Sequence, residues 1–289
     1  MVRFRVVRGS HLLLALSAVI LAAVVVFILV QSTAGESGSI EMLRVEAKAV
    51  SAFASNPSTE TSLQIEVLAD ERDAPPLSGA PCILIYHTHT HEAYEQMAGR
   101  PYEALEAWRT DDEQHSIVRV GAALADELSR LGNFVMHDTT DHEQENIDLA
   151  YVRSLETLES YSLNFDLVID LHRDAYAEGM QINMQDGTST CAQIMLLVGN
   201  GTNYANEEAP DYEGNLAFAH RLTSELNRNK NGIARNVTVK NGRYNQHIGD
   251  TSVLIEVGHN KNTLEEALNS VPILAKSIDS VLKENHQLP

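Results

Sequence analysis

The sequence of 289 residues carries 40 acidic and 21 basic side chains, which gives a formal net charge of −19 at pH 7. A surface this acidic has no general electrostatic attraction to nucleic acid or anionic lipid, which argues against both as partners. Its two cysteines are too few for a disulfide framework or a cysteine metal site.

The first residues predict a membrane anchor. Residues 1–11 hold three arginines and no acid, and Leu12–Val30 contains no charge at all. At about 1.5 Å per residue, a helix over this run just spans a bilayer core of roughly 30 Å. A signal peptide usually has a shorter apolar region, so we predict a retained transmembrane helix, with cleavage near Ser32–Ala34 as the alternative. Because arginines stay in the cytoplasm, we expect residues 31–289 to lie outside the cytoplasmic membrane.

Residues 31–79 predict a linker or stalk, because they are rich in Ser, Ala, Glu, Thr and Pro. Part of this segment, around Thr61–Asp70, has the composition of a strand. The total charge is −19 and residues 1–30 contribute three arginines and no acid, so the predicted exported part carries −22. We expect this charge to keep that part soluble.

From residue 80 to 289, short apolar runs alternate with amphipathic segments. This alternation predicts an α/β domain with a mixed, mostly parallel sheet and helices on both faces. The expected strands cover residues 82–87, 133–140, 165–172, 191–199 and 252–258, and the expected helices cover 116–132, 147–163, 213–229 and a last segment from 262.

Two details of these elements can be read from single residues. The last helix is expected to start at an Asn262 or Thr263 cap followed by glutamates, which suit the positive end of its dipole, and Pro272 falls inside it. Cys82 and Cys191 both lie in apolar runs, so they are either a disulfide or two buried free thiols.

Three predicted strands end in residues that bind metals or transfer protons. Polar side chains beyond the carboxyl ends of strands commonly build the site of an α/β protein. A metal that activates water needs about three protein ligands, an open position and a nearby base, and histidine with carboxylate suits zinc. We therefore predict a metal site from three groups: His87, His89, His91 and Glu92; Asp170, His172, Arg173 and Asp174; and Glu256 with His259.

Strand alternation gives these groups a geometry. In an extended chain His87, His89 and His91 point to one face, although a single histidine is more often an ordinary polar residue and His91 is nearest the loop. Asp170 and His172 also share a face, so Asp170 is a candidate to orient a ligand histidine.

Glu256 stands in the apolar run VLIEVG. Burying an ionised carboxylate without a partner is costly, so Glu256 is expected either to pair with a cation or to act in catalysis. Burial would raise its pKa toward that of a usable acid or base.

Other polar segments have simpler explanations. Glu113 or His115 could add a metal ligand. The simpler explanation of residues 110–116 is an acidic start of the following helix, which suits the positive end of the helix dipole. Tyr244, Asn245 and His247 precede the last strand and either contact substrate or form an ordinary polar loop.

Four segments, in this order, resemble the stage II sporulation protein P family: Leu84–Tyr94, Ile169–Ala175, Tyr244–Gln246 and Leu254–Ala267. The resemblance covers about residues 80–285. It implies a membrane-anchored peptidoglycan hydrolase with the fold of the zinc N-acetylmuramoyl-L-alanine amidases. It also implies cleavage of the amide between muramic acid and L-alanine, with stem-peptide cleavage in some members, and a glycan-cleaving partner enzyme during engulfment.

Carried over by position, the resemblance implies zinc ligands His89, Glu92 and His172 and the catalytic carboxylate Glu256. His87 is an alternative ligand, or a group that orients a ligand. In the mechanism we expect, the metal together with Arg173 or Asn245 stabilises the oxyanion. His91 departs from the family pattern, where a small hydroxyl residue is expected, and so does His259, where glycine is expected. With the short region before the domain, these departures leave open a wall hydrolase outside sporulation.

Two other kinds of function remain open from the sequence. One is a different exported zinc hydrolase, such as a carboxypeptidase or a deacetylase. The other is a non-catalytic wall-binding module.

Overall fold

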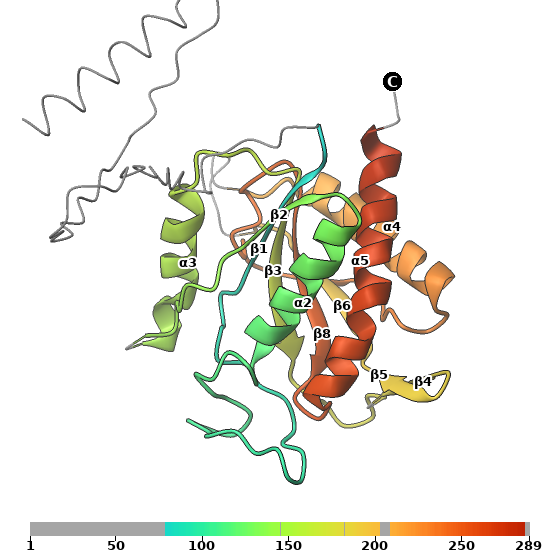
Figure 1. Ribbon diagram of the computed structural model, residues 1–289. Helices are drawn as coiled ribbons and strands as arrows, with labels where there is room; N and C mark the ends of the chain where they lie inside the picture. Colours follow the sequence, from blue (N-terminus) through green and yellow to red (C-terminus); the bar gives the residue numbers. More distant parts are fainter. Residues whose placement is uncertain (1–78, 145, 182, 203–208, 287–289) are drawn as a thin grey trace, which may run out of the picture. The chain divides into compact units, whose positions relative to one another are not determined.

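The computed structural model describes residues 79–144, 146–181, 183–202 and 209–286, all within the second of the chain's two units, Ala69–Pro289. These residues form a six-stranded sheet in the order β2-β1-β3-β8-β6-β7 and a two-stranded hairpin, β4-β5 (Figure 1). The strands are β1 (Cys82–Tyr86), β2 (Phe134–His137), β3 (Leu167–Asp174), β4 (Met184–Asp186), β5 (Ser189–Cys191), β6 (Ile194–Gly199), β7 (Thr238–Lys240) and β8 (Ser252–His259).

The sheet is mixed and mostly parallel, as the sequence predicts. Strands β2, β1, β3 and β8 run parallel to one another, β6 runs antiparallel to β8, and β7 runs parallel to β6. Strands β1, β6 and β8 are buried along their whole length, which explains their continuous apolar runs. The carboxyl ends of β1, β3 and β8 therefore lie side by side at one edge.

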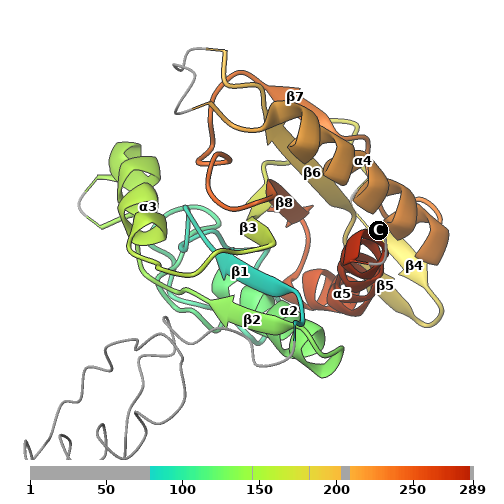
Figure 2. The same cartoon turned by 90° about the horizontal axis from the view of Figure 1, so that it is seen from above.

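Helices cover both faces of the sheet, but unequally (Figure 2). Three helices share one face, and one helix with the 3₁₀ turn before it lies on the other. The three are α2 (Ile117–Arg130), α4 (Tyr212–Asn229) and α5 (Leu264–His286); the other is α3 (Ala150–Glu159), preceded by η2 (Ile147–Leu149).

Alternation along β1 divides the core in the same way. Ile83 and Ile85 belong to the large core beneath α2, α4 and α5. Leu84 and Tyr86 belong to a smaller core that includes Leu158 of α3. Both faces of β1 are therefore removed from water, which is the main stabilising contribution of this strand.

All five predicted strands and all four predicted helices are present within a few residues of the expected bounds. The sequence does not predict β4, β5 and β7, which have three residues each and are largely exposed or half-buried. Strands this short carry too few alternating positions for a period to be recognised.

The start of α5 follows the prediction. The hydroxyl of Thr263 accepts a hydrogen bond from the N–H of Glu266, and the Glu266 carboxylate accepts one from the N–H of Thr263. This reciprocal pair satisfies two donors that a helix start otherwise leaves open. Pro272 lies inside α5, which continues through it.

The cysteines are two buried free thiols. Cys82 lies in the smaller core and Cys191 in the large core. Of the two alternatives the sequence leaves open, the structure therefore supports free thiols.

The predicted anchor and linker, residues 1–78, lie outside the described residues. Within the described part of the chain, no helix combines the length and the apolar character needed to cross a membrane.

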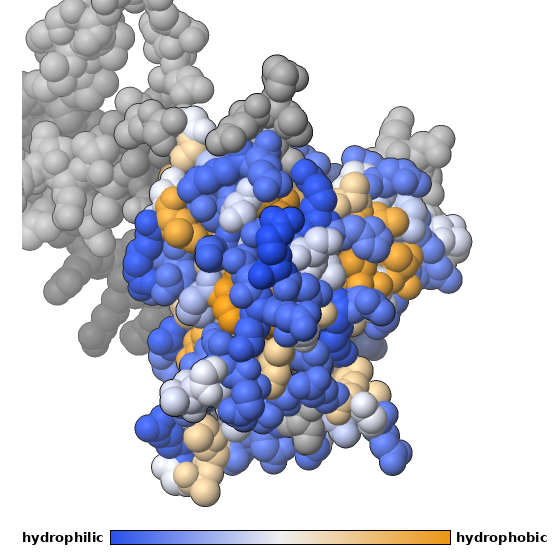
Figure 3. Space-filling view, turned by 90° about the vertical axis from the view of Figure 1, so that its right-hand side faces the viewer, coloured by the Kyte–Doolittle hydropathy of each residue, from blue (hydrophilic) through white to orange (hydrophobic). Residues whose placement is uncertain are grey.

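Figure 3 shows a face on which hydrophilic side chains predominate and hydrophobic ones form small separate groups. Such scattered apolar residues are ordinary for a protein surface.

Candidate active site

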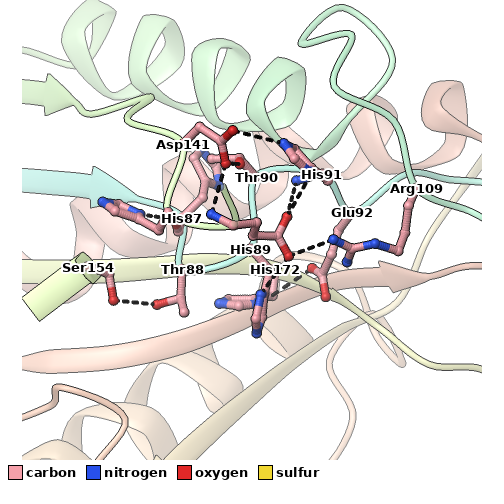
Figure 4. Close-up of polar contacts among 12 residues, drawn as sticks. His87, Thr88, His89, Thr90, His91, Glu92, Arg109, Asp141, Ser154 and His172 are labelled. Atoms are coloured by element: carbon pink, nitrogen blue, oxygen red, sulfur yellow. Dashed lines mark hydrogen bonds and ion pairs between the residues drawn. The ribbon is translucent and has the colours of Figure 1, made fainter. Parts of the chain in front are cut away.

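The three segments predicted to carry chemistry meet at the edge formed by the carboxyl ends of β1, β3 and β8. The parallel order of these strands brings the segments together, and the register places His172 of β3 directly beside Glu256 of β8. Figure 4 shows His89, Glu92 and His172 grouped at this edge.

The histidine run does not continue the strand. Strand β1 ends at Tyr86, and the chain bends through the residues that follow. The prediction that His87, His89 and His91 share a face is therefore wrong, because alternation requires an extended backbone. His87 instead contacts Leu171 and His137, whereas His89 and His91 both contact Glu143.

His89, Glu92 and His172 form the centre of the group. The rings of His89 and His172 meet edge to face with centroids 5.5 Å apart. A carboxylate oxygen of Glu92 lies 3.3 Å from Nδ1 of His172. Burial alone would raise the pKa of Glu92, but His172 and Arg173 outweigh it and lower that pKa.

Asp170 lies against the other side of His172, as expected for two residues on one face of β3. Its Oδ1 is 2.7 Å from Nε2 of His172, close enough for an ion pair but not aligned as a hydrogen bond. The carboxylate also accepts hydrogen bonds from the N–H and hydroxyl of Thr88, at 2.8 and 2.7 Å. Burial would lower the pKa of His172, but Asp170 and Glu92 outweigh it and hold that pKa well above the usual value.

Glu256 faces the same group. It is 8% exposed, and its Oε2 has no hydrogen-bond partner among the described residues. Burial raises the pKa of Glu256 to about 8; His172 opposes the rise, and Glu92 and Asp174 add to it. A buried carboxylate with an open oxygen is suited to proton transfer or to pairing with a cation.

Arg173 is committed to holding the loop that carries Glu92. Its N–H donates to Glu92 at 2.9 Å, and its guanidinium donates to the carbonyls of Ala93 and Trp108, each at 3.0 Å. These contacts fix Glu92 and do not place the guanidinium in the oxyanion-stabilising role predicted from the sequence.

Asn245 is likewise engaged away from the group. Its side-chain amide donates to the carbonyl of Tyr151 at 2.9 Å and to the hydroxyl of Ser154 at 3.0 Å. Tyr244 and Asn245 both have positive φ, 51° and 52°, which is uncommon outside glycine. The ring of Tyr151 contacts those of both His89 and Tyr244 edge to face, with centroid distances of 5.8 and 5.7 Å. The Asn245 loop is thus held to α3 next to the group.

His87 is turned away from His89 and His172 and uses both ring nitrogens. Its Nδ1 lies 2.8 Å from the carbonyl of Leu171, so Nδ1 carries the proton and donates. Its Nε2, 2.8 Å from Nε2 of His137, must then accept from that ring. Burial lowers the pKa of His87 to about 3, and neighbouring His137 adds to the effect. The structure therefore does not bring this candidate ligand to the group.

The remaining candidates lie outside the group. His91 Nε2 is 3.2 Å from Asp141, and His259 Nε2 is 3.2 Å from the carbonyl of Gln181. Glu113 is exposed, and Nδ1 of His115 pairs with Asp112 at 2.7 Å.

The sequence predicts an acidic helix start at residues 110–116. This prediction is wrong, because α2 has no acidic residue in its first turn. The helix is capped instead by the hydroxyl of Ser116, which accepts from the N–H of Val118.

Sequence reasoning missed Glu143. Its Oε1 accepts from Nδ1 of His89 at 2.8 Å and from Arg109 at 2.9 Å. Its Oε2 accepts from the N–H of His91 at 2.7 Å. Burial would raise the pKa of Glu143, but these donors outweigh it and lower that pKa to about 2. The signal was present, because Glu143 follows strand β2, whose carboxyl end borders that of β1.

The donor types fit a zinc ion, since two imidazoles and a carboxylate meet beside an open buried carboxylate oxygen. The side chains contact one another directly. Within the described ranges, no group of three or more His, Cys, Asp or Glu residues is arranged to hold one ion.

Comparison with known proteins points to one family. A sequence model of the family described as Stage II sporulation protein P (SpoIIP) matches residues 32–279. The stage II sporulation protein P of Bacillus subtilis (strain 168) is 25% identical over an alignment of 206 residues, and the match covers 64% of this chain and 47% of that protein. The chain thus spans about half the length of this curated relative.

The comparison with solved structures also finds N-acetylmuramoyl-L-alanine amidases, at low sequence identity and low TM-score. AmiC2 of Nostoc punctiforme is 15% identical with a TM-score of 0.43, covering 73% of this chain and 99% of that chain. The CwlD amidase from Clostridioides difficile, solved in complex with the GerS lipoprotein, is 16% identical with a TM-score of 0.43, covering 72% and 100%.

Proposed function

Because the chain belongs to the stage II sporulation protein P family, we propose that it is a zinc-dependent peptidoglycan hydrolase. The proposed reaction is hydrolysis of the amide between N-acetylmuramic acid and the L-alanine of the stem peptide. The observation that carries the proposal is the meeting of His89, Glu92, His172 and Glu256 at one edge of the sheet.

His89, Glu92 and His172 would hold the zinc ion. Zinc bound by such a set lowers the pKa of a water molecule and polarises a carbonyl group. Asp170 would keep the His172 ring in place, since its own position is fixed by two hydrogen bonds from Thr88.

Glu256 is the proposed acid and base. Its open oxygen can take a proton from the attacking water and later deliver it to the leaving amine. Its pKa of about 8, caused first by burial, would fall beside a bound cation because opposite charge favours the carboxylate. A group tuned in this way can exchange a proton in both directions near neutral pH.

We further propose that residues 12–30 anchor the protein in the cell membrane, with the hydrolase domain on the outer side. There it would act on the wall during sporulation engulfment, next to a glycan-cleaving enzyme. These proposals rest on the charge pattern of the sequence and on family membership.

Glu256→Gln tests the proposed function with little change in shape. We expect the variant to keep its fold and its zinc, and to lose at least about 100-fold in release of peptide from purified sacculi, since it can no longer take a proton. Glu225→Gln is the matched control, because Glu225 on α4 is also 8% exposed and contacts no site residue. Peptide release by Glu256→Gln at the wild-type rate would refute the assignment.

Mass spectrometry of the digest separates the possible reactions. Intact stem peptides with a free L-alanine amine identify the amidase, and shorter fragments identify stem-peptide cleavage. Loss of one terminal residue would identify a carboxypeptidase, and loss of acetyl groups a deacetylase. Sacculi left unchanged, with the protein still bound to them, would identify a wall-binding module.

A further inference from the structure

We infer that Glu143 is a positioning residue that holds the His89 ring in the orientation needed to bind the metal. The inference rests on the proposed function for the presence of the metal. The contacts of Glu143 with His89, Arg109 and His91 do not depend on that proposal. Glu143 lies outside the three segments that carry the predicted ligands.

Glu143 is fully occupied by donors from three places. Its side chain is 1% exposed, and it accepts from Nδ1 of His89, from Nη2 of Arg109 and from the backbone N–H of His91, at 2.8, 2.9 and 2.7 Å. Its own N–H donates to Asp141 at 2.9 Å. A buried carboxylate with several donors is strongly held in one position.

The contact with His89 decides which nitrogen of that ring can bind a metal. An ionised carboxylate only accepts hydrogen bonds, so Nδ1 of His89 must carry the proton. In the neutral tautomer that donates from Nδ1, the lone pair is on Nε2, and the ring cannot turn without breaking the bond to Glu143. A histidine held by a carboxylate on one nitrogen is a common arrangement of metal ligands.

Arg109 makes the arrangement more stable. Its guanidinium balances the buried charge of Glu143, so the carboxylate does not need a proton from His89 to be neutralised. The carboxylate of Glu143 is therefore held in place as the acceptor for Nδ1 of His89.

The test uses Glu143→Gln in the full chain. The amide keeps one oxygen as an acceptor and replaces the other by NH₂, which is a donor. In one orientation the NH₂ faces the donors of His89 and Arg109, and in the other it faces the backbone N–H of His91, so at least one hydrogen bond is lost in both. We expect zinc affinity, measured by competition with a chromophoric chelator, to fall by about 10- to 100-fold. We also expect the visible spectrum of the cobalt-substituted protein to change. Glu143→Asp, which keeps the charge, should recover part of the affinity.

Asp138→Asn is the matched control. Asp138 lies in the same segment and accepts hydrogen bonds from Tyr161 and Thr140 but contacts neither His89 nor His91. The Asp138→Asn variant should be less stable than the wild type but should bind zinc with the same affinity. Equal zinc affinity in Glu143→Gln and the wild type would overturn the inference.

A second readout needs no metal. Long-range ¹H–¹⁵N spectra of the metal-free wild type should show His89 protonated on Nδ1, and protonation on Nε2 alone would overturn the inference. Absence of zinc binding by the wild type would instead refute the proposed function, so the two failures can be told apart.

Discussion

At the scale of single residues, three carboxyl groups surround His172. Asp170 and Glu92 lie at 2.7 and 3.3 Å from its ring nitrogens, and Glu256 stands beside it on the next strand. Burial is the first cause of the raised pKa of Glu256, which is about 8. Repulsion from the carboxylates of Glu92 and Asp174 raises this pKa further. A divalent cation would relieve this repulsion, so the charge distribution itself favours binding one.

The buried pair of His87 and His137 behaves in the opposite way, because both rings are held neutral. Burial lowers the pKa of His87 to about 3 and that of His137 to about 4. An unfolded histidine has a pKa of about 6.5, so between these values the unfolded chain binds more protons than the folded one. The free energy of unfolding should therefore fall as the pH drops from about 6.5 toward 4.

His137→Leu tests this pH dependence. The variant lacks one histidine that must lose its proton on folding, so it should lose roughly 1–2 kcal/mol less stability than the wild type between pH 7 and pH 5. Urea unfolding of both proteins at the two pH values measures the difference. Equal losses would contradict the depressed pKa of His137.

At the scale of elements, helix α2 packs on this histidine pair through Gly121. A Cβ atom at Gly121 would lie 2.5 Å from Nε2 of His137 and 2.6 Å from Nε2 of His87. Real contacts are not this short, so a larger residue would force the helix or the rings to move. The glycine costs helix stability but allows the close approach.

Gly121→Ala should therefore destabilise the protein although alanine is the better helix former. We expect a net loss of up to about 2 kcal/mol, since overpacking costs about 1–3 kcal/mol and the gain in helix propensity is about 1 kcal/mol. Thermal or urea unfolding measures it. Combining the change with His137→Ala removes one of the two clashing rings and should recover part of the loss; strictly additive effects would argue against the clash.

Elements could be predicted from the sequence where burial imposes a long pattern. The apolar run of β8 and the apolar face of α2 are clear, because each covers eight residues or more. The bend after Tyr86 could not be predicted in this way. It is imposed by tertiary contacts, such as that of Thr88 with Asp170 across 82 residues of sequence, and alternation alone gives no sign of it.

At the scale of the whole molecule, the site joins segments that are distant in the chain. The convergence of His89, His172 and Glu256 could be predicted, because neighbouring parallel strands end at the same edge. The position of Glu143 after β2 gave a signal, but its contact with His89 and the engagement of Arg173 and Asn245 could not be predicted, since they depend on where loops fold back. Residue type alone does not tell whether a polar group faces a site or a backbone carbonyl.

Zinc should stabilise the whole fold if the site holds it. A ligand that binds only the folded state at 100 times its Kd adds about 2.7 kcal/mol. For a domain of about 200 residues this corresponds to a rise in Tm of roughly 5–10 °C. Thermal unfolding with zinc and with a chelator measures the rise, and His172→Ala should abolish it. A zinc-induced rise of the same size in His172→Ala would place the ion elsewhere.

The two thiols on opposite sides of the sheet bear on how the protein can be made. With Cys82 and Cys191 both buried and unpaired, no covalent bond between distant segments has to form during maturation. A strong reductant should therefore leave the melting curve unchanged, and the domain should reach its native state in a reducing cytosol as readily as in an oxidising compartment.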